Sequence, residues 1–260
     1  GKSTTIRIMM NIYNADAGEV RIFGKPPVSV RRRVGYLPQE RGLYTDETAM
    51  SVLTYLAQLK GLDRATARAN SRRWLERVGL VDRANEKLRG FSGGMQQLVQ
   101  FIASVVHEPD LVSLDEPFAG LDPVNVGEVK DLIREINADG KTILLSSHQL
   151  NLVEELCDRI MLIDDGKAAL YDRIETIREQ HSPSVVRVRT ETPLNGVLDG
   201  FGYVEKRGDC EADVTLSDSQ PPQDILRHLV QQGVPVAAFE QPKRTLEEIF
   251  INVVRKNDHA

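Results

Sequence analysis

The chain has 260 residues, of which 41% are hydrophobic and 27% are charged, so it has room for one large domain or for a large and a small one. Its net charge of -5 and pI near 5.6 disfavour non-specific binding to nucleic acid. No apolar run approaches the roughly 18 residues that cross a bilayer. Cys157 and Cys210 lie far apart, which predicts reduced thiols of a cytosolic protein.

The chain opens on Gly1-Lys2-Ser3-Thr4, and the apolar residues that follow predict a helix over residues 5–12. These residue types suit a phosphate group. Glycine lets the backbone approach closely, Lys2 can pair with phosphate oxygens, and the Ser3 hydroxyl can ligate Mg²⁺. A phosphate loop also needs a preceding strand and an earlier glycine, so we expect the natural protein to extend before Gly1. Taken alone, the four residues fit an ordinary charged helix start equally well.

Two short strands are expected over residues 19–23 and 33–37, and Gln39 follows the second one after a proline. Apolar residues at helical spacing then predict two helices between residues 46 and 80, each ending at a glycine. We therefore expect a helical subdomain over about residues 45–90. A lone glutamine is usually a surface residue, so the interest of Gln39 lies in its position where the α/β part meets this subdomain.

Helices and strands alternate from Ser92 onward. Ser92 can cap a helix that runs to Val106, and a buried strand is expected after it. The further elements expected are strands over 111–115, 142–146 and 159–163, and helices over 124–137 and 149–157. Strands that alternate with helices predict a mainly parallel sheet with helices on both faces.

Asp115 and Glu116 stand at the carboxyl end of the predicted buried strand, where open parallel sheets bind ligands. Burying two carboxylates is costly unless a metal, a proton or a cation offsets the charge. We expect Asp115 beside Mg²⁺ and Glu116, on the other side of the strand end, near an attacking water. His148 follows the next strand and is expected at the same edge, although a lone histidine is more often structural.

Ser92-Gly93-Gly94 forms a second helix start whose backbone N–H groups can face an anion. Two such starts cannot easily serve one nucleotide within one subunit. We therefore expect a head-to-tail homodimer, in which the Lys2 loop of one subunit and the Ser92 loop of the other clamp each nucleotide.

A small C-terminal domain is expected over residues 183–260, joined to a first domain over residues 1–172 by a polar linker at 172–183. Its expected elements are strands over 185–189, 212–216 and 234–239, and helices over 222–232 and 245–254. Catalytic residue types do not cluster there, which favours a docking or dimerisation module.

The order of these motifs strongly resembles the ATP-binding subunit of ABC transporters, over about residues 1–170. The matching segments are G-K-S-T at 1–4, Gln39 after a strand, S-G-G-M-Q-Q at 92–97, L-V-S-L-D-E-P at 111–117, G-L-D at 120–122 and S-S-H at 146–148. The resemblance implies an α/β fold with a phosphate-loop nucleotide-hydrolase core and a helical subdomain, plus a small C-terminal α+β domain. Two residues depart from the family's usual signature: Phe91 replaces Leu and Met95 replaces Gln.

The resemblance also implies roles for single residues. The phosphates of ATP would be bound by Gly1, Lys2, Ser3 and Thr4, and the ligands that serve Mg²⁺ would be Ser3, Gln39 and Asp115. Glu116 would be the catalytic base and His148 the switch at the γ-phosphate. Asp122 would belong to a loop that communicates between subunits, and the partner's nucleotide would be bound by Ser92, Gly93 and Gly94.

Finer likenesses narrow the type of transporter. The segments G-Y-L-P-Q-E-R-G-L-Y at 35–44, D-E-P-F-A-G-L-D-P-V-N at 115–125 and T-L-E-E-I-F at 245–250 resemble the exporter group of sodium-efflux and drug-resistance ATPases. This implies an ATPase subunit in the cytoplasm, peripheral at the inner face of the cell membrane. An integral-membrane permease subunit would dock on its helical subdomain, and no nucleic acid would be bound.

The sequence fits two other functions less well. A soluble ABC-type ATPase acting on ribosomes or DNA usually carries two cassettes or a long coiled coil, and the sequence predicts neither. A regulatory subunit that binds ATP without hydrolysing it is disfavoured by the intact Asp115-Glu116 pair and by His148.

Overall fold

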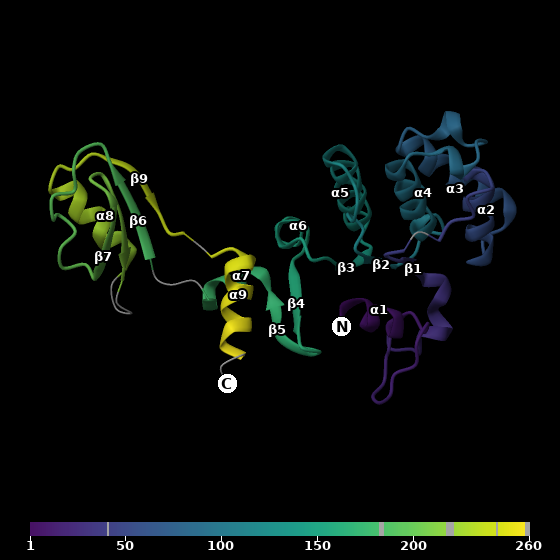
Figure 1. Cartoon of the computed structure of the whole chain (residues 1–260), viewed down its shortest axis with the longest axis horizontal. Helices are drawn as coiled ribbons and strands as arrows, with labels where there is room; N and C mark the ends of the chain where they lie inside the picture. The colour runs from purple at the N-terminus through teal and green to yellow at the C-terminus, as the bar shows by residue number, and fades with distance from the viewer. Residues whose placement is uncertain (41, 182–184, 217–220, 243, 258–260) are drawn as a thin grey trace. The chain divides into compact units, whose positions relative to one another are not determined.

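A computed structural model describes the chain except for residues 41, 182–184, 217–220, 243 and 258–260 (Figure 1). It divides into two compact units. The first comprises Gly1–Cys157 and Asp165–Lys167, and the second comprises Asp158–Asp164 and Ala168–Ala260.

A three-stranded parallel sheet forms the centre of the first unit. Its strands, in spatial order, are β1 (Val34–Leu37), β2 (Leu111–Asp115) and β3 (Thr142–Ser146). All residues of the middle strand β2 are buried. The register pairs Leu37 with Leu114 and Asp115 with Ser146, so the carboxyl ends of the strands meet at one edge. The parallel sheet expected from the alternation of helices and strands is therefore confirmed.

The strand expected over residues 19–23 is wrong. Ile22 makes an isolated bridge to Lys25, and no extended ladder forms there. Ile22 is buried instead in a small apolar cluster with Val30, Val34 and Leu111. Its apolar character thus reflects packing rather than membership of a sheet.

Four helices of the first unit begin at side chains that satisfy free N–H groups of the first turn. Thr48, Asp63, Ser92 and Asp122 each accept hydrogen bonds from the first turn that follows them. The helices are α1 (Lys2–Met9), α2 (Ala49–Leu59), α3 (Arg64–Arg77), α4 (Gly93–Val105), α5 (Pro123–Ala138) and α6 (Leu150–Leu156), with short 3-10 turns η1 (Pro27–Arg33), η2 (Val81–Arg83) and η3 (Leu88–Gly90). Figure 1 shows α2, α3 and α4 side by side, and they contact one another.

The helix α4 packs unusually close to the sheet. A Cβ atom on Gly35 of β1 would lie 2.0 Å from the Ser104 carbonyl oxygen of α4, so only glycine fits there. The core continues from β2 through α4 to α2 and α3, and includes the fully buried side chains of Phe101, Leu53 and Leu75. Helix α4 and strand β1 are therefore fixed against each other.

The second unit contains a four-stranded antiparallel sheet in the order β7-β8-β6-β9. Its elements are β4 (Arg159–Asp164), β5 (Lys167–Arg173), α7 (Ile174–His181), β6 (Val185–Thr190), β7 (Tyr203–Gly208), β8 (Glu211–Thr215), α8 (Pro222–Gln231), β9 (Val236–Glu240) and α9 (Leu246–Asn257). Strands β4 and β5 form a separate two-stranded sheet, α7 contacts α9, and α8 contacts β9. The mixture of helices and antiparallel strands agrees with the expected α+β character. The unit begins at Asp158 rather than at residue 183, and β4, which was expected in the parallel sheet, pairs with β5 instead.

The linker expected at 172–183 is partly wrong, because residues 174–181 form the helix α7. Ile174 and Ile177 are buried on one face of this otherwise polar helix. Ser182 and Pro183, where the linker was expected to end, lie outside the described residues. Strands β5 and β7 were not expected from the sequence.

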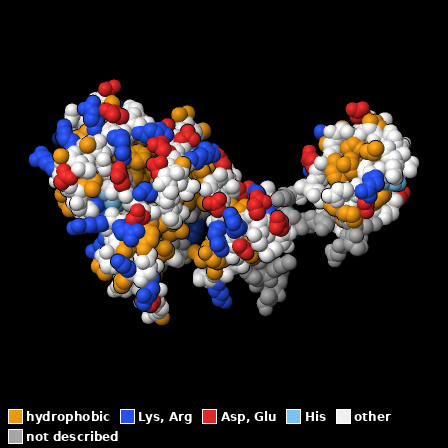
Figure 2. Space-filling view, turned by 180° about the vertical axis from the view of Figure 1, so that it is seen from behind, with side chains coloured by type: hydrophobic (Ala, Val, Ile, Leu, Met, Phe, Trp, Pro, Cys, Tyr) orange, Lys and Arg blue, Asp and Glu red, His pale blue; other side chains and the backbone are white. Residues whose placement is uncertain are grey.

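Charged side chains of both signs are interspersed over the face of the first unit that Figure 2 displays. None of the helices in the described ranges is long and apolar enough to cross a membrane.

Candidate functional site

Asp115, at the end of β2, is fully buried and holds its carboxylate against two hydroxyl groups. Its Oδ1 accepts hydrogen bonds from Ser3 Oγ of α1 at 3.1 Å and from Ser146 Oγ of β3 at 2.7 Å. Its Oδ2 is buried and has no hydrogen-bond partner among the described residues. Such an oxygen is costly unless a cation binds it, and hydroxyl and carboxylate oxygens are the hard ligands that Mg²⁺ prefers. The residues present therefore fit a magnesium ion.

Glu116 leaves the strand in a left-handed backbone conformation, with a φ of 52°. Residues other than glycine rarely adopt this region, and such strain collects at functional sites. The Glu116 N–H donates to the Ser146 carbonyl at 2.9 Å, which fixes the turn. Its side chain is buried, with Oε1 3.3 Å from Lys2 Nζ and Oε2 2.8 Å from His148 Nδ1. The carboxylates of the two adjacent acids thus contact different side chains.

The start of α1 brings Lys2 and Ser3 to these acids. Gly1 precedes the helix, and no described side chain caps its first turn. The free N–H groups of that turn are therefore available to an anionic ligand. Thr4 is exposed on the same turn. The structure thus gathers the Gly1–Thr4 helix start, both acids and His148 at the carboxyl edge of the parallel sheet.

Gln39 also follows a strand of this sheet, but among the described residues no hydrogen bond joins it to the buried acid. It is exposed just beyond β1, and both hydrogen bonds to Asp115 come from serines. Gln39 therefore lies at the predicted edge of the sheet. It is not hydrogen-bonded to Asp115, the residue with which it was expected to bind Mg²⁺.

Ser92 caps α4 as predicted, because its hydroxyl accepts the Met95 N–H at 3.2 Å. Ser92 and Gly93 are exposed at this helix start. Arg83 of η2 lies over the Phe91 ring, 4.8 Å from its centroid, and donates to Met95 Sδ at 3.2 Å. The two residues that depart from the usual signature therefore share one neighbour, which holds the segment before Ser92 and the first turn of α4 together.

Asp122 caps α5 and is linked to the Ser92 helix start through Asn125. The N–H groups of Val124 and Asn125 donate to Asp122 Oδ1 at 3.0 and 3.1 Å, and the Asn125 amide donates to Oδ2. These bonds hold the pKa of the Asp122 carboxyl below its usual value. A Cβ atom on Gly94 would lie 2.4 Å from Asn125 Nδ2. The Asp122 loop and the start of α4 are therefore in direct contact.

Ser146 is a site residue that the sequence did not single out. Its hydroxyl donates to Asp115 and its carbonyl accepts the Glu116 N–H, so it orients both acids. The S-S-H segment contains it, but nothing local in that segment distinguishes Ser146 from Ser147. Only the register of β2 with β3 places it opposite Asp115.

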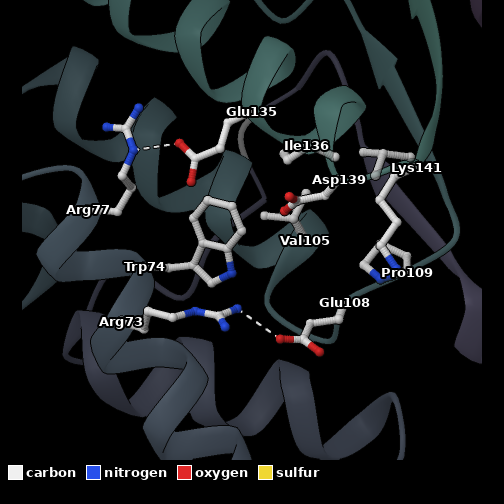
Figure 3. Close-up of a pocket in the computed structure, with 11 residues that line it drawn as sticks. Arg73, Trp74, Arg77, Val105, Glu108, Pro109, Glu135, Ile136, Asp139 and Lys141 are labelled. Carbon is white, nitrogen blue, oxygen red and sulfur yellow. Dashed lines mark hydrogen bonds and ion pairs between the residues drawn. The ribbon is translucent and has the colours of Figure 1, made fainter.

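A cavity of about 410 Å³ lies elsewhere in the first unit, between α3, the end of α4 and α5 (Figure 3). Trp74 and Ile136 line it together with charged residues, four of which form ion pairs with one another. Arg73 binds Glu108 at 2.8 Å, and Arg77 binds Glu135 at 2.6 Å. None of the residues at the carboxyl edge of the sheet lines this cavity, so it is separate from the site of the two acids.

Comparison with known proteins agrees with this geometry. Residues 1–119 match the family model described as ABC transporter, and residues 173–254 match the model of the C-terminal domain of DrrA1-3-like ATP-binding proteins. An uncharacterised ABC transporter ATP-binding protein of Bacillus subtilis, YhaQ, is 33% identical over 256 residues, covering 98% of this chain and 86% of that protein. The chain belongs to the ABC transporter ATP-binding proteins. It is an ATPase of this family.

Other ABC ATP-binding proteins are similar along nearly the whole chain. The daunorubicin/doxorubicin resistance protein DrrA of Streptomyces peucetius is 30% identical, covering 96% of this chain and 80% of that protein. A fluoroquinolones export ATP-binding protein of Mycobacterium tuberculosis is 33% identical, covering 97% and 79%. A solved structure of an ATP-binding subunit of an ABC transporter superposes with a TM-score of 0.64 at 32% identity, over 69% of this chain and 77% of that one.

Proposed function

We propose that this ABC ATPase is the energy-supplying subunit of an exporter, in which two copies close head to tail around two molecules of Mg-ATP. The proposal rests on one observation: two adjacent acids at one edge of the sheet contact different residues. Asp115 contacts Ser3 at the start of α1, whereas Glu116 contacts Lys2 and His148. A metal-binding acid beside a separate general base is the arrangement that phosphoryl transfer to water needs.

Ser3, Asp115 and Gln39 would hold the magnesium ion in this proposal. When bound, Mg²⁺ neutralises charge on the phosphates and polarises the oxygens of the transferred group. In the described part of the chain, His, Cys, Asp and Glu do not gather in groups of three or more that could hold a metal. A site of one carboxylate, one hydroxyl and one amide suits Mg²⁺, which takes its other ligands from phosphate and water.

Glu116 would accept a proton from the attacking water, and His148 would hold that carboxylate in place. The Lys2 side chain is 42% exposed, so its ammonium group can turn from Glu116 to a phosphate oxygen. That movement would release Oε1 of Glu116 to act as a base while Oε2 stays bonded to His148. The N–H groups at the start of α1, with Gly1 and Thr4, would bind the same phosphates.

Dimerisation would complete each nucleotide site with Ser92, Gly93 and Gly94 of the other subunit. Two features support this. Ser92 and Gly93 are exposed at the start of a helix, where an anion is favoured. Val124, two residues after Asp122, is 82% exposed, so another subunit could cover this side chain without any rearrangement. Asp122 would then lie in the contact between subunits.

The membrane partner is proposed to be an integral-membrane permease that docks on the helical subdomain at about residues 45–90. Drug resistance and export in the names of two relatives support the exporter type. Tyr55 and Leu59 of α2 are about half exposed or more, and Tyr55 stacks edge-on against the equally exposed Tyr44. These side chains offer an apolar surface to a partner at the inner face of the membrane.

Replacing Glu116 by Gln in the full-length protein tests the core of this proposal. The amide keeps the shape of the side chain but cannot accept a proton, so ATP turnover is expected to fall at least about 100-fold. ATP binding stays within about threefold of wild type, and ATP now holds the variant as a dimer in size-exclusion chromatography. Glu108→Gln, which changes an exposed acid far from the site, is the control. Near-normal turnover by Glu116→Gln would remove Glu116 from this role.

A further inference from the structure

Three glutamines of α4 use their side-chain amides to hold backbone carbonyls of three separate loops. Gln96 Nε2 donates to the carbonyls of Leu88 and Phe91, just before the Ser92 helix start. Gln97 and Gln100 reach the other way, toward the loops that follow β2 and β1. One helix thus contacts both the surface proposed for the partner's nucleotide and the loops of its own site.

Gln100 brackets the Gln39 loop. Its Nε2 donates to the Pro38 carbonyl at 3.1 Å and to the Glu40 carbonyl at 3.0 Å, on either side of Gln39. Gln100 is 5% exposed, and its two hydrogen bonds to the loop are partly buried. Because two carbonyls face the amide nitrogen, its orientation is determined, and the loop has a fixed attachment to α4 next to the proposed metal ligand.

The burial of Gln100 is not explained by stability alone. Its Oε1 is buried and has no hydrogen-bond partner among the described residues. An unpaired buried acceptor is destabilising, and an apolar side chain of the same size would avoid that cost. Pro38 is half-buried and Glu40 exposed, so their carbonyls could bond to water if the amide were lost. The glutamine at this position is therefore better explained by its two hydrogen bonds to the Gln39 loop than by a contribution to stability.

Gln97 makes a similar contact with the residue that follows Glu116, the proposed base. It is 5% exposed, and its Nε2 donates to the Pro117 carbonyl at 3.2 Å. Pro117 follows Glu116, whose backbone is already in a strained conformation. Gln97 and Gln100 are three residues apart and therefore lie on one face of the helix.

We propose that Gln97 and Gln100 are positioning residues, which make the loop of Gln39 and the turn after Glu116 move with α4. This rests on the proposed function of Gln39 and Glu116. Closing of a partner subunit on Ser92 would press on the start of α4, and the two amides would carry that displacement to the loops of the subunit's own nucleotide. The close packing of α4 on Gly35 restricts the helix to small, coupled movements.

Gln100→Met in the full-length protein tests the proposal, with Asn70→Leu as the matched control. Asn70 also donates its amide to a carbonyl, that of Val106 at 3.0 Å, but at the far end of α4. We expect the NMR order parameters of the Gln39 and Glu40 amides, about 0.85 in a rigid backbone, to fall below about 0.6 in Gln100→Met only. Maximal ATP turnover falls about tenfold while KM for ATP stays within about twofold, because the metal ligand is misplaced rather than the nucleotide lost.

A double variant separates positioning from a general effect on folding. If Gln100 acts through the loop, Gln39→Ala with Gln100→Met turns over ATP within about twofold of Gln39→Ala alone. Multiplied losses, or an unchanged order parameter at Gln39 in Gln100→Met, would overturn the proposal. If Gln100→Met does not fold, Gln100→Asn, which shortens the amide by one methylene, is measured in the same way. A wild-type protein without ATP turnover would refute the proposed function, and the order parameters would still decide whether Gln100 holds the loop.

Discussion

The hydroxyl of Ser146 donates a 2.7 Å hydrogen bond to the buried carboxylate of Asp115, its register partner on the neighbouring strand. The carbonyl of Ser146 also accepts the N–H of Glu116. One residue of β3 therefore orients both acids of the proposed site, and the sheet itself acts as the scaffold of the chemistry.

Ser146→Ala is expected to weaken the proposed metal site. Asp115 then keeps only Ser3 as a hydroxyl donor, and losing a hydrogen bond to a charged group costs about 1.5–3 kcal/mol. We expect the Mg²⁺ concentration for half-maximal ATP turnover to rise about tenfold. The control is Ser147→Ala, because that hydroxyl accepts only a local bond from Gln149 N–H at 3.0 Å. Equal Mg²⁺ dependence in the two variants would contradict the assignment.

The stability of the first unit is expected to fall in mild acid because of His107. Burial, and secondarily the nearby Lys60 ammonium, lower the pKa of His107 from 6.5 to about 4. Between pH 6.5 and about pH 4, His107 therefore binds a proton in the unfolded chain but not in the folded chain. Stability present above pH 6.5 is therefore lost as the pH falls toward 4.

Urea unfolding at pH 7.5 and pH 5 measures this effect, and we expect His107 to account for a loss of about 2 kcal/mol between them. Trp74 is the single tryptophan of the chain, so its fluorescence reports on the first unit. In His107→Gln the loss between the two pH values should shrink by that amount. An undiminished loss would mean that other groups cause the acid sensitivity.

Val124→Asp is expected to prevent the ATP-dependent dimer without unfolding the subunit. The side chain is 82% exposed, so the substitution should change stability by no more than about 0.5 kcal/mol. In the interface proposed here it would bury an unpaired charge. Analytical ultracentrifugation of Glu116→Gln with and without Val124→Asp, in ATP, compares the two. Val28→Asp, at another exposed valine, should leave the dimer intact, and a persistent dimer in Val124→Asp would place the interface elsewhere.

Tyr55→Ser is expected to weaken binding to the membrane partner. It removes an exposed ring of the proposed apolar docking surface, which packs edge-on against Tyr44 with 6.2 Å between ring centroids. Buried aromatic residues often dominate an interface, so co-purification with a permease should fall at least about tenfold. Tyr171→Ser, at an exposed tyrosine of β5, serves as the comparison. Undiminished co-purification of Tyr55→Ser would move the docking surface away from α2.

The carboxyl edge of the sheet could be predicted because its strands leave a local signal. Residues 111–115 and 142–146 are apolar runs that end in polar side chains, and parallel strands align such ends. Ser92 and its helix were also predictable, since a cap and an apolar face lie within one short segment. These features need only neighbouring residues to be recognised.

The errors concern elements defined by distant contacts. Strand β7 exposes nearly all of its side chains and is held by backbone pairing with β8, which leaves no mark on hydropathy. Helix α7 looks like a linker because only Ile174 and Ile177 are buried, and its partner α9 follows much later in the chain. The role of Ser146 depends on strand register, and the contacts of Gln100 depend on the path of a loop 60 residues away. None of these features can be recognised from neighbouring residues in the sequence.

The contact between Gly94 and Asn125 affects how a substitution of Gly94 must be interpreted. A methyl group at position 94 would displace an amide that lies 2.4 Å away and that also bonds to Asp122. Gly94→Ala would therefore disturb the α5 cap as well as the helix start that it is meant to probe. A defect in such a variant reports on two loops at once, and only a compensating truncation of Asn125 can assign it to one of them.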